Sequence, residues 1–257
     1  MGRGAIKFLG TAGARFVVAK QIRYSAGTHI RLAGESIILD PGPGTLLRMA
    51  RSKPSIDATK LSAVILSHLH IDHSTDVNAV IDAMTAGGFA RRGVLFAPRQ
   101  SLEGEDAVVL RYLRGHLDEV VTLEAASEYR LGDLSFVTSI PHDHGCETYG
   151  IRFRHEGLTV SFMVDTRFFP GLIQDYSDSD VLIMNVVRRE PHESGEVLHL
   201  CVDDVRRILA DVRPRKAVLT HFGMTMIRAK PWVVAERLSD ELGSEVIAAS
   251  DGMTLEL

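Results

Sequence analysis

The sequence predicts an α/β fold with four layers (αββα), in which two mixed sheets pack face to face and helices cover their outer faces. Two observations favour this architecture: short strand-like runs recur along the whole chain, and helical patterns lie between them. A hydrophobic fraction of 45% is ample for the buried layers that such a fold requires. A length of 257 residues suits one domain, which we expect to span residues 1–257.

The first half of the chain contains strand-like runs that are bounded by turn residues. They are Ala5–Leu9, Thr28–Leu32, Ser36–Leu39, Leu61–Ser67 and Val94–Ala97. A turn at 33–35 joins the second and third runs, and the last two are short and apolar, as buried strands tend to be. Two helices are expected, at Gly44–Arg51 and at Val77–Thr85, where Gly87 and Gly88 supply a stop signal.

The second half repeats this alternation with longer helices. The expected strands are Ser135–Ile140, Tyr149–Arg154, Leu158–Val164, Val181–Val187, Lys216–Thr220 and Glu245–Ala249. A helix over Val202–Val212 has its apolar residues at the three-and-four spacing of a one-sided helix, and it ends before Pro214. A last helix is expected over Trp232–Glu241.

Charge and cysteine content narrow the functional classes. The formal net charge is −4 and no basic run stands out, so composition alone gives no electrostatic case for nucleic-acid binding. Two cysteines, Cys146 and Cys201, are too few for a disulfide framework or a cysteine-based zinc site. No apolar run reaches the ~20 residues that span a bilayer, and the N-terminal stretch lacks a signal-peptide core. We therefore expect a cytoplasmic protein with reduced thiols and no membrane partner.

The segment from Ser67 to His73 concentrates metal-binding chemistry. It has the sequence Ser-His-Leu-His-Ile-Asp-His and directly follows an apolar strand. His68 and His70 point the same way if the chain is extended, and a helix that begins near Asp72 would turn Asp72 and His73 toward a neighbouring point. Imidazole and carboxylate groups suit Zn²⁺, and also Mn²⁺ or Fe²⁺. The alternative, a polar helix start with unrelated histidines, is disfavoured because clustered imidazoles repel one another when protonated.

This His-x-His-x-Asp-His pattern resembles the signature of the metallo-β-lactamase superfamily. The superfamily's other motifs have matches in the same order, at Asp40, His144, Asp165 and His221, each at or near the end of a predicted strand. For the third motif His142, two residues from His144, stays open as the alternative ligand. The resemblance extends from about residue 5 to the C-terminus.

The resemblance implies the four-layer fold and a dinuclear metal centre. It assigns His68, His70 and His144 to one divalent ion, Asp72, His73 and His221 to a second, and Asp165 to both. Zinc is the first expectation, with manganese or iron as alternatives. A hydroxide that bridges the two ions would attack the substrate. Asp72 would orient that nucleophile, and Asp40 would hold a ligand histidine through its other ring nitrogen.

His199 points to one branch of the superfamily. Its position, about twenty residues before His221 and ahead of a helix, is similar to that in ribonuclease Z and in the phosphoribosyl cyclic phosphodiesterases. There a histidine faces the scissile phosphate, so we expect His199 to be catalytic. The sequence departs from both families. The span from His144 to Asp165 is too short for a tRNA-clamping arm, and no cysteine precedes Cys146 to form an additional zinc site.

The function expected from these features is hydrolysis of a small or nucleotide-like phosphodiester. Hydrolysis of a thioester, lactone or lactam is the alternative, followed by a di-iron redox protein. The sequence leaves a homodimer open. Among the remaining histidines, His29 and His155 are expected on the surface, and a structural role is expected for Cys146.

Overall fold

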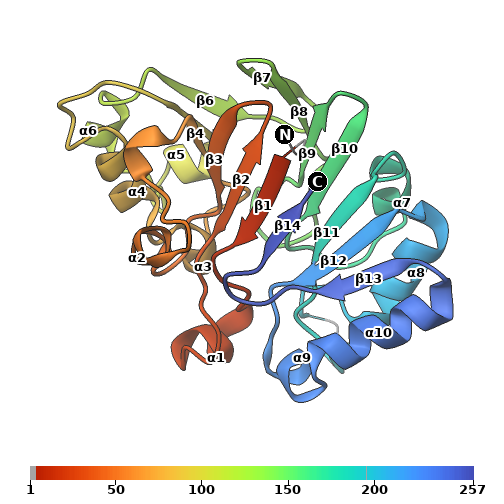
Figure 1. Ribbon diagram of the computed structural model, residues 1–257. Coiled ribbons are helices and arrows are strands. Elements are labelled where there is room, and N and C mark those ends of the chain that lie inside the picture. Colours follow the sequence, from red (N-terminus) through yellow and green to blue (C-terminus); the bar gives the residue numbers. More distant parts are fainter. Residues whose placement is uncertain (1–3, 195) are drawn as a thin grey trace.

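A computed structural model describes residues 4–194 and 196–257 and contains two seven-stranded sheets (Figure 1). The first has the order β14-β1-β2-β3-β4-β5-β6 and the second the order β13-β12-β11-β10-β9-β8-β7. The strands of the first sheet are β1 (Gly4–Phe8), β2 (Thr28–Leu32), β3 (Glu35–Leu39), β4 (Ala63–Ile65), β5 (Val94–Pro98), β6 (Glu119–Leu123) and β14 (Thr254–Glu256). Those of the second are β7 (Glu128–Leu131), β8 (Leu134–Thr138), β9 (Ile151–His155), β10 (Leu158–Met163), β11 (Val181–Asn185), β12 (Lys216–Thr220) and β13 (Glu245–Ala248).

Both sheets are mixed, as the sequence predicts. In the first, β14, β1, β2 and β3 pair antiparallel, whereas β3, β4, β5 and β6 pair parallel. In the second, β7 to β10 pair antiparallel and β10 to β13 parallel. Because parallel strands end at a common sheet edge, the residues that follow β3 and β4, or β10, β11 and β12, lie close together.

Helices cover the outer face of each sheet (Figure 1). Beside the first sheet lie α2 (Thr45–Arg51), η1 (Ala58–Lys60), α3 (Ile71–Ser74), α4 (Val77–Met84), α5 (Arg99–Leu102) and α6 (Arg111–Arg114). Beside the second lie α7 (Gly171–Asp175), α8 (Val202–Val212) and α10 (Pro231–Leu242), and at the lower edge of Figure 1 are α1 (Ala14–Ala19) and α9 (Met224–Arg228). The four-layer prediction is therefore confirmed.

The burial pattern of the inner strands explains the layers. In β3, Ile37 and Leu39 belong to the cluster between the two sheets, while Ile38 belongs to the cluster under α4. In β12, Val218 faces the inter-sheet cluster, and Leu219 packs in the cluster under α8 and α10. Successive side chains of a strand point to opposite faces, so a strand that is apolar at every position is buried on both sides.

The sequence patterns do not predict several elements. They are the strands β6, β7 and β14, the short helices α1, α5, α6, α7 and α9, and the 3-10 helix η1. The strands β6 and β7 lie at the sheet edges and are partly exposed, so they lack a continuous apolar run.

The prediction that His29 lies on the surface is wrong: its side chain is buried in β2, and its Nε2 lies 2.9 Å from Ser36 Oγ.

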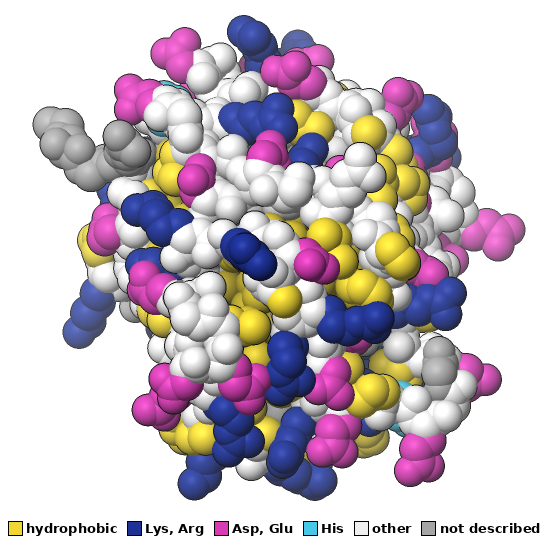
Figure 2. All heavy atoms as spheres, turned by 90° about the vertical axis from the view of Figure 1, so that its right-hand side faces the viewer, with side chains coloured by type: hydrophobic (Ala, Val, Ile, Leu, Met, Phe, Trp, Pro, Cys, Tyr) yellow, Lys and Arg dark blue, Asp and Glu magenta, His cyan; other side chains and the backbone are white. Residues whose placement is uncertain are grey.

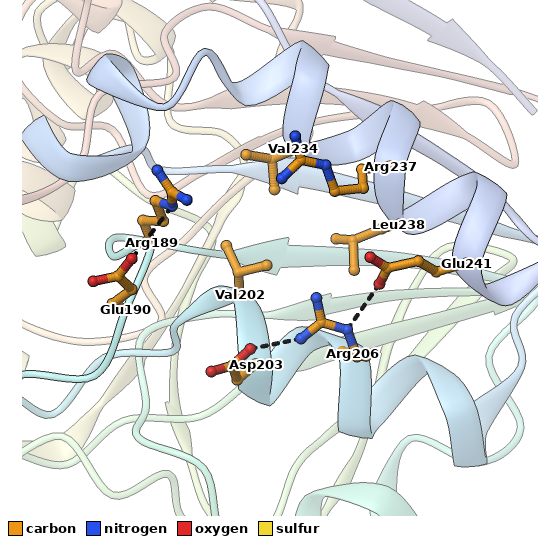
Figure 3. A pocket seen from close by; sticks show the side chains of 9 residues that line it. All are labelled: Arg189, Glu190, Val202, Asp203, Arg206, Val234, Arg237, Leu238 and Glu241. Carbon is orange, nitrogen blue, oxygen red and sulfur yellow. Dashed lines mark hydrogen bonds and ion pairs between the residues drawn. The ribbon is translucent and has the colours of Figure 1, made fainter.

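The surface on the side of helices α8 and α10 carries charges of both signs. Figure 2 shows this face, on which basic and acidic side chains are interspersed. A groove of about 210 Å³ between α8 and α10 is bordered by Arg206, which forms ion pairs with Asp203 and Glu241 (Figure 3). These charges pair with one another and lie on the outer helical layer, so the groove does not define the chemical site. Among the described residues, no helix combines the length and apolarity that crossing a membrane requires.

Candidate metal centre

Residues from both sheets meet at the edge where the parallel strands end. His68 and His70 lie in the loop after β4, and α3 supplies Asp72 and His73. Other members of the cluster come from the second sheet: His144 from the loop between β8 and β9, Asp165 two residues after the end of β10, and His221 directly after β12. The fold therefore brings together all seven residues that the resemblance assigns to the two ions.

One group of donors consists of His68, His70 and His144. His70 Nδ1 and His144 Nε2 are 3.0 Å apart, and one ring nitrogen of each of the three residues lies within 4.8 Å of the others. The three rings are mutually edge-on, with centroids 4.8 to 5.0 Å apart. Three nitrogens at this separation can act as ligands of one ion.

A second group consists of Asp72, His73 and His221. Asp72 Oδ2 lies 3.7 Å from His221 Nε2 and 4.0 Å from His73 Nε2. Asp165 Oδ2 stands between the two groups, 3.3 Å from both His73 Nε2 and His221 Nε2 and 3.4 Å from His144 Nε2. A single carboxylate oxygen thus approaches donors of both groups.

The donor atoms fit divalent ions. In the part of the chain that the structure describes, the buried atoms His68 Nε2, His73 Nε2 and His221 Nε2 have no hydrogen-bond partner. His73 and His221 approach Asp165 without hydrogen-bond geometry. Burying unpaired polar atoms is costly, so three in one cluster indicate that a ligand completes it. Such nitrogens, next to a carboxylate, form the donor set of Zn²⁺ and related ions.

Hydrogen bonds at the opposite ring nitrogens set the tautomers that metal binding needs. His73 Nδ1 lies 3.0 Å from Asp40 Oδ2, and His68 Nδ1 lies 2.9 Å from Ser67 Oγ, which itself donates to Asp40 Oδ2 at 2.6 Å. His144 Nδ1 donates to the carbonyl oxygen of Leu198 at 2.9 Å. A proton held on Nδ1 leaves the lone pair of Nε2 free to bind an ion.

The electrostatics of the cluster also suit a cation. Burial holds the pKa of His68 well below its usual value, which keeps its lone pair available. Burial alone would raise the pKa of Asp165, but the nearby His221, His199 and His73 hold it well below the usual value, so Asp165 is an anion. Burial opposes a charge on His73, yet the carboxylates of Asp165 and Asp72 raise its pKa well above the usual value. A bound cation would replace the His73 proton as the partner of these carboxylates.

The structure separates the two candidate histidines of the third motif. His142 is buried and uses both ring nitrogens within the protein: Nδ1 donates to the carbonyl oxygen of Asp165 at 3.2 Å, and Nε2 lies 2.9 Å from Tyr176 Oη. Burial lowers the pKa of His142 to about 4. His144, in contrast, faces the cluster.

Close backbone packing holds the loops of the cluster together. A Cβ atom on Gly42 would lie 2.0 Å from the carbonyl oxygen of Asp72, and one on Gly13 would lie 2.3 Å from that of His221. Asp40 and His221 have left-handed backbones, with φ of 51° and 59°. Non-glycine residues adopt this conformation at a cost, and such strain is typical of functional sites.

Comparison with known proteins identifies the family. Residues 35–222 match the family model described as "Beta-lactamase superfamily domain". The chain belongs to this superfamily. It is 32% identical over 299 aligned positions to ribonuclease Z of Thermobifida fusca, with 95% of this chain and 92% of that protein covered. It is also 31% identical over 262 positions to protein MJ1374 of Methanocaldococcus jannaschii, covering 99% and 96% of the two chains.

Solved structures of the superfamily share the fold over nearly the whole chain. The metallo-β-lactamase fold protein YhfI from Bacillus subtilis superposes with a TM-score of 0.81 at 19% identity and covers 99% of both chains. Human tRNase Z, short form, superposes with a TM-score of 0.70 at 16% identity, with 98% of each chain covered. A diphosphatase of the PhnP family gives 0.73 at 19% identity, covering 99% of this chain and 97% of that one. The predictions of a ribonuclease Z-like branch and of a metal-dependent hydrolase are confirmed at this level.

His199 lies at the margin of this superfamily site. Its Nδ1 is 3.7 Å from Asp165 Oδ2, its ring centroid is 4.8 Å from that of His144, and its side chain is 19% exposed. Burial lowers the pKa of His199 to about 4, so its ring is neutral at pH 7. A neutral imidazole still has one N–H group with which to donate a hydrogen bond.

Sequence reasoning missed two residues of the site. Ser67 links Asp40 to His68, and Asn185 Nδ2 donates a hydrogen bond to Asp165 Oδ1 at 2.8 Å. Asn185 ends an otherwise apolar strand, which is the only signal that it leaves in the sequence. Cys146 Sγ lies 3.9 Å from His70 Nε2, on the side of the ring away from His144.

Proposed function

We propose that this protein is a phosphodiesterase that uses two divalent metal ions, zinc in the first instance, on a small or nucleotide-like substrate. The observation that supports it most is the position of Asp165 Oδ2, within 3.4 Å of donors from two separate groups. His68, His70 and His144 would hold one ion, and Asp72, His73 and His221 the other, with Asp165 shared. The packing of both sheets around one inter-sheet cluster supports a single domain over residues 1–257.

When bound, the ions would supply Lewis acidity and a water of lowered pKa. The protein's own groups then have separate tasks. Asp40 and Ser67 keep His73 and His68 in the required tautomers through the hydrogen bonds described above. Asp72 has a side chain that is 19% exposed, so it can accept a hydrogen bond from an incoming water and orient it.

His199 would contact the substrate rather than an ion. The seven other residues would supply three donors to each of the two ions and one donor that both share. His199 is therefore not needed as a ligand. Its neutral ring can donate a hydrogen bond to a phosphoryl oxygen on which charge develops. The low pKa supports this role over that of a proton donor to the leaving group.

The proposal favours small substrates over precursor tRNA. Between His144 and Asp165 the chain forms a loop and the hairpin of β9 and β10, whose turn contains only Glu156 and Gly157. This short span supports the absence of a clamping arm between these two residues.

A substrate screen tests the proposal. Chelator-treated protein, reconstituted with zinc, manganese or iron, would be assayed on bis-p-nitrophenyl phosphate, cyclic nucleotides, thioesters and lactones. We expect phosphodiester hydrolysis that depends on added metal. Hydrolysis of thioesters or lactones alone would replace the proposal with another ester class, and efficient 3′-end cleavage of precursor tRNA at physiological salt would overturn the choice of substrate.

Two histidine variants test the role of His199. His199→Ala should retain both ions and lose about a hundredfold or more in turnover, because the developing charge is no longer stabilised. The matched control is His155→Ala, which removes a histidine in β9 that lies outside the cluster and should leave turnover unchanged. If His199→Ala loses turnover equally on substrates with good and poor leaving groups, His199 stabilises charge. A larger loss of turnover with the poor leaving group indicates that His199 donates a proton. Full activity on both substrates would remove His199 from the mechanism.

A further inference from the structure

Asn185 stands at the end of the strand between those that supply Asp165 and His221. In the parallel pairing of β10 with β11, Met163 lies opposite Met184, and in that of β11 with β12, Asn185 lies opposite Thr220. The residue after Thr220 is His221, and Asp165 follows β10 by two residues. The register therefore fixes Asn185 beside the carboxylate that both donor groups approach.

The two oxygens of Asp165 have different surroundings. Oδ2 faces the cluster, where His73, His144 and His221 lie 3.3 to 3.4 Å away. Oδ1 accepts the hydrogen bond from Asn185 Nδ2 at 2.8 Å, and within residues 4–194 and 196–257 no other side chain donates to it. The carboxylate is only 2% exposed, so solvent contributes little to Oδ1. The hydrogen bond from Asn185 thus holds Oδ1 on the side away from the histidines, with Oδ2 toward the cluster.

An amide is suited to this task because it donates without adding charge. A lysine or arginine here would compete with the cations for Asp165, whereas an aspartate would set a second anion against a buried one. Outer partners that orient a ligand group typically change metal affinity about 10- to 100-fold when they are removed. We infer that Asn185 is a positioning residue that holds Asp165 with Oδ2 toward both donor groups, where this oxygen would be available to both metal ions; the inference rests on the proposed dinuclear centre.

The other asparagine of the chain provides a matched control. The sequence contains only two asparagines, Asn78 and Asn185. The side-chain amide of Asn78 forms two hydrogen bonds with the backbone: Nδ2 donates to the carbonyl oxygen of Val108 at 2.8 Å, and Oδ1 accepts from the N–H of Leu110 at 2.9 Å. It lies in α4, bonds only the backbone of the 108–110 segment and belongs to neither donor group, so its loss reports general destabilisation.

The experiment is a titration of chelator-treated protein with Co²⁺, followed by visible absorption and by competition with a chelator of known affinity. Asn185→Ala and the similarly sized Asn185→Leu should bind Co²⁺ about 10- to 100-fold more weakly and show an altered absorption spectrum. Asn78→Ala should lower the unfolding temperature yet keep the wild-type affinity and spectrum.

Wild-type affinity and spectrum in both Asn185 variants would overturn the inference, while leaving the dinuclear centre intact. An equal loss in Asn78→Ala would overturn it too, because the effect would then follow from destabilisation. If the wild-type protein itself bound no Co²⁺, the proposed metal centre would fail, and the role of Asn185 with it.

Discussion

Replacing Asp40 by asparagine should weaken metal binding although the side chain keeps its size. Asp40 accepts three hydrogen bonds, from the Ser67 backbone N–H at 2.7 Å, from Ser67 Oγ at 2.6 Å and from His73 Nδ1 at 3.0 Å. Asparagine offers one acceptor oxygen in place of two, so at least one of these donors would meet an N–H₂ group. Asparagine also tolerates the left-handed backbone of this position, so the change isolates the chemistry of the side chain.

The expected magnitude follows from these contacts. A hydrogen bond to a charged group is worth roughly 1.5–3 kcal/mol, so we expect the metal-free protein to lose about 2 kcal/mol of unfolding free energy. If the new amide donates to His73 Nδ1, or through Ser67 turns His68 to its other tautomer, the nitrogen that faces the cluster carries a proton and cannot bind an ion. Zinc affinity should therefore fall about 10- to 100-fold.

Urea unfolding and zinc competition with a chelator would measure both effects. Asp178→Asn is the control, since Asp178 is exposed and forms surface ion pairs with Arg152 and Arg154. Such pairs contribute about 0–1 kcal/mol, and zinc affinity should not change. Wild-type zinc affinity in Asp40→Asn would refute the reasoning that Asp40 sets the tautomers of the ligand histidines.

Three further predictions follow from the same geometry. His144→Ala should lose metal from the cluster by elemental analysis, whereas His142→Ala should keep it; the reverse result would mean that His142 is the ligand. Burial lowers the pKa of His29 to about 4, so the folded protein favours the neutral ring. The contribution of this residue to the unfolding free energy is therefore complete above pH 6.5 and is lost as the pH falls toward 4. At ~1.36 kcal/mol per pKa unit, the unfolding free energy of the wild type should fall by about 3 kcal/mol more than that of His29→Gln when the pH is lowered from 7 to 4. Urea unfolding at the two pH values measures this difference, and an equal fall in both proteins would contradict the prediction. Gly42→Ala should lower the unfolding temperature and the metal content together, because its Cβ meets the Asp72 backbone; a variant with normal values of both would disprove that close approach.

The sequence predicts most of the inner fold because buried strands and one-sided helices leave local patterns. The β4 strand and the histidines after it are contiguous, so spacing alone indicates His68, His70 and His73 as donors, whereas His144, Asp165 and His221 are implied by the family resemblance. Edge strands leave weaker signals: β14 has three residues and pairs with β1 from the far end of the chain. The burial of His29 was missed because an alternating strand does not reveal which of its polar residues is covered by neighbouring chain segments.

The site residues that the sequence does not reveal are those whose role depends on long-range contacts. Asn185 is 20 positions from Asp165, and Ser67 is 27 positions from Asp40. Neither residue type has a local pattern that distinguishes it from an ordinary polar residue at the end of a strand. Only the register of the parallel strands brings these partners within hydrogen-bond distance.

The most direct test of the proposed function is the rate of bis-p-nitrophenyl phosphate hydrolysis as zinc is added stepwise to chelator-treated protein. A phosphodiesterase with two ions that share Asp165 predicts that the rate reaches its plateau at two equivalents of bound zinc per chain. The same titration of Asp165→Ala should give neither a second tightly bound equivalent nor comparable turnover. A plateau at one equivalent would contradict the dinuclear centre, and a protein that binds two equivalents without hydrolysing any phosphodiester would contradict the proposed reaction.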